Sequence, residues 1–152
     1  MSRCLGLDLS LSDSGWCLFN DVYAGRTSYG HKEFPAPKKG RKTIPDEPDR
    51  RLHDMMKWLT FLIHDKKPDR IAYEEPAGQN LKVLHGVRGI MYAVAGDIPF
   101  YWLYPTSLKK YAGSGKFDKD DMREALFMKT GIRIENDNEV DAYFLALWGS
   151  EQ

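Results

Sequence analysis

The order of strand-like and helix-like segments is the feature that most constrains the fold. The first 34 residues hold three segments with strand character, at residues 3–8, 16–19 and 22–34, and turn-forming residues such as Ser12–Gly15 separate them. After residue 48, helical and strand patterns alternate. Early hairpin strands followed by strands joined through helices predict an α/β fold with a mixed five-stranded sheet and helices on both faces.

Helical periodicity positions the later elements. Leu52, Met55, Leu59 and Leu62 recur at the spacing of one buried helix face, which predicts a helix over residues 49–65. A short apolar segment with an acidic end indicates a central strand at residues 70–74. The other predicted elements are helices at 80–95, from residue 105, at 118–130 and at 138–148, and a strand at 98–104.

The length of 152 residues predicts one domain spanning residues 1–152. No apolar run approaches the roughly 20 residues that a membrane span needs, and Asp8 interrupts the first apolar stretch, so we expect neither a membrane segment nor a signal peptide. A cytoplasmic location follows by default. Residues 35–48 are rich in proline and contain Lys38, Lys39 and Arg41, which predicts a basic surface loop.

Several reactive or aromatic residue types are expected to be structural. Cys4 and Cys17 lie in apolar, strand-like segments, where a small buried side chain explains them. The four tryptophans occupy positions compatible with the core, and none of the four histidines shows metal-ligand spacing. We therefore assign these residues no part in chemistry from the sequence.

Three carboxylates lie where predicted elements end or begin. Asp8 is a charged side chain in an otherwise apolar first strand, where it would cost several kcal/mol if it had no partner. Glu74 closes the predicted central strand. Asp141 opens an apolar helix, with Asp137 and Asn138 about one turn before it. Each carboxylate alone has an ordinary structural explanation as a cap or a lysine partner.

Together the three carboxylates predict a metal site. If the strands at 3–8 and 70–74 are parallel neighbours, Asp8 and Glu74 converge, and a helix packed across the sheet brings Asp141 to them. Carboxylates that close raise one another's pKa. A hard cation relieves this repulsion, and Mg²⁺ prefers oxygen ligands. Two Mg²⁺ ions about 4 Å apart, with Mn²⁺ as a substitute, would suit in-line displacement at a phosphodiester.

With these residues in view, the chain resembles the RuvC-type Holliday-junction resolvases, particularly their short phage-like members. The resemblance covers nearly the whole chain and implies the ribonuclease-H-like fold, whose order of elements matches the one predicted here. Its motifs are residues 5–10 (LGLDLS) with 14–16 (SGW), 71–76 (IAYEEP), 108–119 with their lysines, and 136–143 (NDNEVDAY).

The resemblance implies which residues form the site. The family's acidic positions correspond to Asp8, Glu74, a residue one turn before Asp141, and Asp141 itself. Many relatives carry Asp or His three residues before the last Asp, whereas this chain has Asn138 there and Asp137 one position earlier. Either Asn138, through its amide oxygen, or Asp137 would then complete the ligand set.

Basic residues are the candidates for DNA contact. The resemblance implies that Lys109 and Lys119 contact the scissile phosphate region or the junction strands, with Lys116 as a further candidate. The basic residues of the loop at 35–48 would follow backbone phosphates. An ordinary solvated surface explains any of these side chains as well.

The leading hypothesis is a Mg²⁺-dependent endodeoxyribonuclease that resolves four-way DNA junctions by paired symmetric nicks. Because the junction has two-fold symmetry, we expect a homodimer, with its contact on the helix at 79–95 and its small residues. No organic cofactor is expected. The resemblance suggests DNA recombination and repair as the setting, in the host cytoplasm if a phage encodes the protein.

Three alternatives remain. The same fold and metal site would also serve a nuclease for flaps, forks or RNA-containing duplexes. A catalytically impaired protein that binds branched DNA is a second alternative, because Asn138 departs from the family pattern. The residues 8–10 and 14–15 also resemble the phosphate-binding loop of the actin and hexokinase fold, but that fold needs a second related domain.

Overall fold

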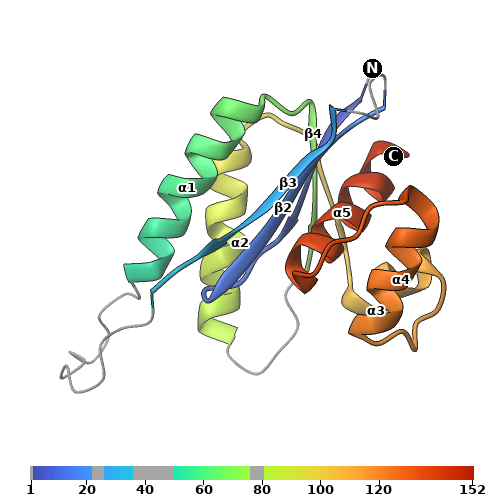
Figure 1. Cartoon of the computed structure of the whole chain (residues 1–152). Coiled ribbons are helices and arrows are strands. Elements are labelled where there is room, and N and C mark those ends of the chain that lie inside the picture. The colour runs from blue at the N-terminus through green and yellow to red at the C-terminus, as the bar shows by residue number, and fades with distance from the viewer. Residues whose placement is uncertain (1, 22–25, 36–49, 76–80) are drawn as a thin grey trace.

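The computed structural model describes residues 2–21, 26–35, 50–75 and 81–152. Within these ranges the chain forms five strands and five helices (Figure 1). The strands are β1 (Arg3–Asp8), β2 (Asp13–Asn20), β3 (Ser28–Glu33), β4 (Arg70–Glu74) and β5 (Phe100–Leu103). The helices are α1 (Arg50–Lys66), α2 (Leu81–Ala95), α3 (Pro105–Ala112), α4 (Lys119–Thr130) and α5 (Asp137–Ser150).

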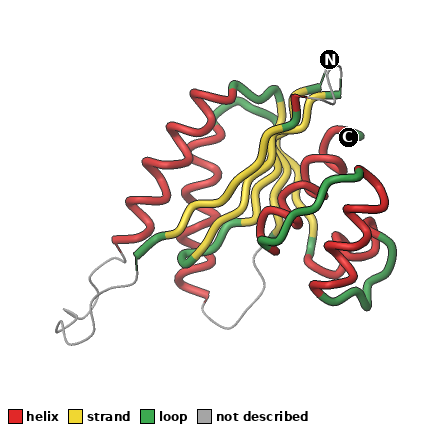
Figure 2. Tube along the Cα trace, viewed as in Figure 1, coloured by secondary structure: helices red, strands yellow, loops and turns green. Residues whose placement is uncertain are grey.

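The five strands form one mixed sheet in the order β3-β2-β1-β4-β5. β2 pairs antiparallel with both β1 and β3, whereas β1, β4 and β5 are parallel. Helices α1 and α2 cover one face, and α5 covers the other with α3 and α4 outside it (Figures 1 and 2). The predicted mixed five-stranded α/β sheet with helices on both faces is confirmed.

Strand alternation divides the core between the two faces of the sheet. Leu5, Leu7, Ile71 and Tyr73 point toward α1 and α2, where they pack in one buried cluster. Their neighbours along β1, β2 and β4, which include Cys4, Cys17 and Ala72, pack with α5 in the other. Both cysteines are buried and free, as expected. The expected burial of all four tryptophans is wrong for Trp102, because edge strand β5 leaves it 42% exposed.

The predicted turn at Ser12–Gly15 is wrong, because β2 already begins at Asp13. Asp13 pairs with Glu33, and Gly15 pairs with both Asp8 and His31, so two ladders occupy this backbone. Tertiary pairing therefore overrides the turn preference of Asp, Ser and Gly. A Cβ atom at Gly15 would lie 2.0 Å from the carbonyl oxygen of Asn138. Glycine at this position therefore allows the backbone of α5 to pack closely against β2.

The N-terminus of α5 has its own cap. The Asn136 side-chain oxygen accepts hydrogen bonds from the backbone N–H groups of Asn138 and Glu139. A Cβ atom at Gly6 would lie 2.1 Å from the carbonyl oxygen of Ala142, so α5 also lies directly on β1. Gly6 and Gly15 thus leave room for the backbone of α5 to pack directly on β1 and β2, and the Asn136 cap fixes where the helix begins.

Two regions of the sequence predictions remain untested. The basic loop lies almost wholly outside the described residues, and Lys38, Lys39 and Arg41 fall in that undescribed part. The third predicted strand, at 22–34, is confirmed for Ser28–Glu33 and wrong for residues 26, 27 and 34, and its residues 22–25 lie outside the described ranges. Among the helices of the described ranges, none is long and apolar enough to cross a membrane.

Candidate metal centre

Asp8, Glu74 and Asp141 converge beside the first turns of α5. Asp8 and Glu74 follow the paired residues Leu7 and Tyr73 at the ends of neighbouring parallel strands. Alternation along β1 and β4 points both carboxylates toward the face that α5 covers. Asp141 lies on α5 immediately before Ala142, whose carbonyl oxygen packs over β1. The structure thus brings together the three carboxylates that the sequence singled out.

Burial and mutual repulsion disfavour the charged forms of these carboxyls. Burial raises the pKa of Asp8 well above its ordinary value, and the charges of Glu74 and Asp141 add to the effect. Burial and the Asp141 charge raise the pKa of Glu74 to about 7. Burial and the charge of Asp137 raise the pKa of Asp141 to about 6. The ionised cluster therefore needs a positive partner.

A pocket of about 260 Å³ opens beside the cluster. Glu74, Asp141 and Asn138 line it from β4 and α5, and Lys109 lines it from α3. The Lys109 charge lowers the pKa of both Glu74 and Asp141, although burial outweighs it. The pocket therefore presents carboxylate and amide oxygens next to an ammonium group.

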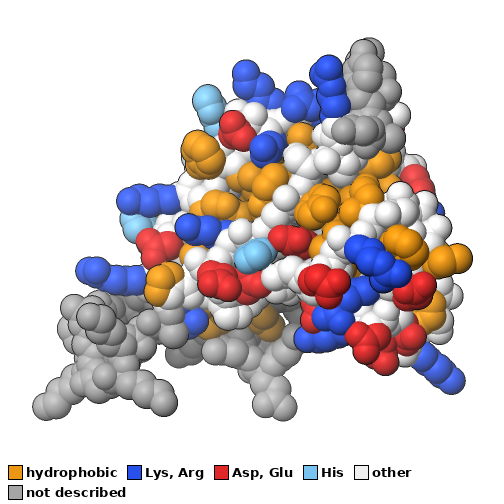
Figure 3. Space-filling view, viewed as in Figure 1, with side chains coloured by type: hydrophobic (Ala, Val, Ile, Leu, Met, Phe, Trp, Pro, Cys, Tyr) orange, Lys and Arg blue, Asp and Glu red, His pale blue; other side chains and the backbone are white. Residues whose placement is uncertain are grey.

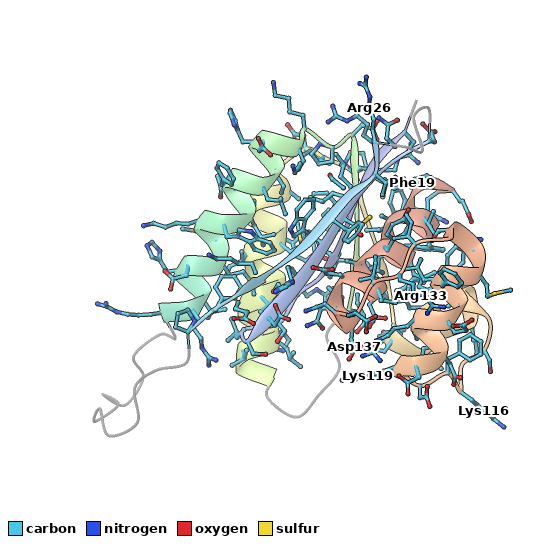
Figure 4. The ribbon with its side chains drawn as sticks, viewed as in Figure 1. Phe19, Arg26, Lys116, Lys119, Arg133 and Asp137 are labelled. Carbon is cyan, nitrogen blue, oxygen red and sulfur yellow. The ribbon has the colours of Figure 1, made fainter. Side chains whose placement is uncertain are left out.

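Asp137 and Asn138 differ in how they are held. The carboxylate of Asp137 makes ion pairs with Lys119 (3.0 Å) and Arg123 (2.6 Å), both from α4. In Figure 4, Asp137 and Lys119 lie close together below α5. The Asn138 amide instead donates to Asp13 at 3.1 Å. The carboxylate of Asp137 already has two cationic partners, which favours Asn138 over Asp137 as a further ligand.

The candidate lysines lie at different distances from the cluster. Lys109 is half-buried in the pocket wall, and Lys119 lines the pocket but is 79% exposed and paired with Asp137. Lys116 is exposed and extends away from the site in Figure 4. The sequence reasoning missed Arg123. Arg123 lies four residues after Lys119 in a predicted helix, so the two basic side chains share one helix face, and this spacing could have identified Arg123.

A second group of metal-ligating side chains lies beside the first turn of α5. Asp13, His31 and Glu33 each offer a ligand atom, and these atoms lie within 4.8 Å of one another. His31 Nδ1 and Glu139 Oε1 are 2.8 Å apart, and this hydrogen bond raises the pKa of His31. In Figure 3 acidic side chains gather around a histidine in the middle of the visible face. The sequence analysis considered only spacing along the chain, which gives no sign of these neighbours of His31.

The sequence could not reveal this group. Asp13 was assigned to a turn, and the register that pairs Asp13 with Glu33 and brings His31 opposite Gly15 is a property of the assembled sheet. Exposed groups of this kind also occur without an ion. The oxygen donors at Asp8, Glu74 and Asp141, with the Asn138 amide, fit a hard cation such as Mg²⁺ better than a site containing imidazole does.

The raised pKa values predict a pH effect on metal binding. As the pH falls through about 7 and then about 6, Glu74 and Asp141 take up protons that compete with a cation, so affinity for Mn²⁺ should fall. Without metal, the folded state binds more protons than the unfolded state. The free energy of unfolding should therefore fall as the pH rises through the same window. Calorimetric titration checks the first trend, which a pH-independent affinity would contradict. Thermal unfolding of the metal-free protein checks the second, which an unchanged or rising stability across this range would contradict.

Comparisons with known proteins bear on the fold. No protein-family model and no curated protein matches the sequence. Among solved structures, the complex of Thermus thermophilus RuvC with a Holliday junction substrate superposes with a TM-score of 0.73 at 19% identity, covering 97% of this chain and 92% of that one. Another Thermus thermophilus RuvC structure gives a TM-score of 0.67 at 21% identity, with coverages of 95% and 90%.

A eukaryotic protein gives a similar result. The yeast mitochondrial Holliday junction resolvase Ydc2 superposes with a TM-score of 0.66 at 19% identity, covering 95% of this chain and 77% of that one. The chain therefore has a ribonuclease-H-like fold. More narrowly, it has the fold of the RuvC-type resolvases, as the sequence motifs predicted.

Proposed function

We propose that the protein is a Mg²⁺-dependent endonuclease that resolves four-way DNA junctions by paired symmetric nicks. The observation that carries the proposal is the convergence of Asp8, Glu74 and Asp141 beside a pocket lined by Lys109. The fold supports the substrate class, because a solved structure of the same fold is described as a RuvC in complex with a Holliday junction substrate.

The proposed chemistry assigns a role to each group. Asp8, Glu74 and Asp141 would hold two divalent ions, and Asn138 would add an amide oxygen. When bound, the ions supply an activated water and stabilise the leaving oxygen of a phosphodiester. Lys109 would offset the negative charge that a phosphate brings to the pocket, and the more exposed Lys119 and Lys116 would contact a DNA strand farther from the cluster.

The proposed assembly is a homodimer in contact with branched DNA. Two equivalent nicks in a two-fold symmetric junction need two equivalent sites, which a C2 dimer supplies. The predicted contact is the helix at 79–95, which corresponds to α2 and carries the exposed Tyr92 (48%). Beyond it, Trp102 on edge strand β5 is 42% exposed and Tyr104, just after β5, is 56% exposed. Mass measurement at micromolar concentration, with and without junction DNA, checks this assembly, and a monomer in both conditions would contradict it.

Cleavage of a labelled, mobile four-way junction tests the proposed function. Matched linear duplex, flap, fork and RNA-containing duplexes serve as competitors, each in Mg²⁺, Mn²⁺, Ca²⁺ and EDTA. We expect paired nicks in the junction with Mg²⁺ or Mn²⁺ and no cutting in EDTA. Preferential cutting of flaps, forks or hybrids would change the substrate class.

The same assay addresses the catalytically impaired alternative, which Asn138 motivates. Junction binding without cutting in any of the metals would favour a structure-selective DNA-binding protein. Recombination and repair of DNA, in the host cytoplasm if a phage encodes the protein, is the setting that we propose for the activity.

A further inference from the structure

Asp13 is bound to the helix that carries the candidate metal ligands. It lies at the first residue of β2, and its Oδ2 atom accepts hydrogen bonds from the side-chain amides of Asn136 (3.0 Å) and Asn138 (3.1 Å). Asn136 is the cap of α5, and Asn138 lines the pocket with Glu74 and Asp141. One carboxylate therefore connects the start of β2 to two asparagines on the first turn of α5.

The chemistry of these contacts fixes which way both amides point. An ionised carboxylate only accepts hydrogen bonds, so the atom that each asparagine presents to Asp13 is its NH₂ nitrogen. Asn136 agrees with this assignment, because its oxygen is already used by the helix cap. For Asn138 the consequence is that the amide oxygen is the end of the side chain turned away from Asp13 and available to a cation.

We propose that Asp13 is a positioning residue of the metal centre, which holds the Asn138 amide with its oxygen free for the ion and supplies nearby the negative charge that Asn138 itself lacks. This inference rests on the proposed function. The position three residues before Asp141 would then hold a neutral ligand with a carboxylate behind it. Groups that orient a metal ligand in this way are worth about 10- to 100-fold in metal affinity.

The charge of Asp13 acts on one member of the carboxylate cluster, the carboxyl group of Asp8. It is one of the charges that raise the pKa of Asp8, after burial and the charges of Glu74 and Asp141. Its Oδ1 atom is buried and accepts no hydrogen bond from the described residues. No lysine or arginine of the described ranges forms an ion pair with Asp13, whereas Lys119 and Arg123 neutralise Asp137. Asp13 therefore adds a charge that has no cationic partner among the described lysines and arginines, whereas the charge of Asp137, which acts on Asp141, is paired.

Exchanging the two side chains tests this inference. Affinity for Mn²⁺, measured by calorimetry and by the electron paramagnetic resonance of free Mn²⁺ without DNA, should fall about 10- to 100-fold in Asp13→Asn. In the double variant Asp13→Asn with Asn138→Asp, the amide and the carboxylate exchange positions, so the contact between residues 13 and 138 can form with residue 13 as the donor, while Asn136 loses its acceptor at this atom. The double variant should regain most of the wild-type affinity.

A purely structural role gives a different pattern. If Asp13 only ties β2 to the cap of α5, thermal unfolding shifts in both variants and Asn138→Asp restores no affinity, which would overturn the inference. His31→Ala is the matched control, because it leaves the contacts of Asp13 with the asparagines intact. An equal loss of Mn²⁺ affinity in His31→Ala would mean that Asp13 acts with His31 and Glu33, which also overturns it.

The outcomes separate this inference from the proposed function. If the wild-type protein binds Mn²⁺, Asp8→Asn does not and Asp13→Asn does, the role of Asp13 is refuted and the proposed metal site is not. A wild-type protein that binds no Mn²⁺ would refute both.

Discussion

Replacing Asp8 with asparagine is expected to lower junction cleavage by at least about 1,000-fold, because a catalytic metal contributes several kcal/mol of transition-state stabilisation. The side chain keeps its shape, so the fold and the affinity for junction DNA should stay close to wild type. Single-turnover cleavage and gel-shift binding measure the two quantities separately. Asp54→Asn, at an exposed carboxylate on α1, is the matched control and should cut normally.

The same substitution should raise the thermal stability of the metal-free protein at neutral pH. Burial and the charges of Glu74 and Asp141 raise the pKa of Asp8, so its ionised form opposes folding, and asparagine removes that charge. A functional carboxylate commonly costs stability in this way. Asp8→Asn protein that is destabilised, or that still cuts junctions at the wild-type rate, would contradict the account of this site.

The second large effect is expected at Gly15. A Cβ atom there would lie 2.0 Å from the Asn138 carbonyl oxygen and 2.7 Å from the Glu139 nitrogen, both backbone atoms that cannot rotate away. Gly15→Ala should therefore lower the free energy of unfolding by about 3 kcal/mol or more, at the upper end for overpacking. Since the displaced turn of α5 carries Asn138, metal affinity should fall as well.

Gly89→Ala is the matched control for Gly15→Ala. Gly89 lies in α2, and a Cβ atom there would meet nothing within 4 Å. This substitution should stabilise the protein by about 0.4–1 kcal/mol, because alanine loses less conformational entropy in a helix. Urea denaturation measures both variants. A Gly15→Ala protein as stable as wild type would show that α5 does not pack on β2 as described.

The elements that the sequence predicted well are those whose pattern is local. The spacing of Leu52, Met55, Leu59 and Leu62 is a property of one helix, and α1 spans Arg50–Lys66 as expected within a residue. The start of β2 was missed because Asp13–Gly15 have turn preferences, which the pairing with β1 and β3 outweighs. Local preference failed where the backbone has partners on both sides.

The candidate site shows the same division. Asp8 was identifiable because a carboxylate in an apolar strand needs a partner, and the order of the elements predicted its approach to Glu74. The neutralisation of Asp137 by Arg123 and the contact of Asp13 with Asn138 depend on how α4 and β2 pack against α5. These contacts form between elements that are distant in the sequence, so the sequence leaves the choice between Asp137 and Asn138 open, and the geometry favours Asn138.

Anomalous diffraction from a crystal soaked in Mn²⁺ tests the central claim most directly, since it locates the ion without depending on activity. The account predicts anomalous density between the carboxylates of Asp8, Glu74 and Asp141, with the Asn138 amide oxygen facing it. Density only at Asp13, His31 and Glu33, or none beside Asp8 in a crystal whose pocket is open to solvent, would contradict it.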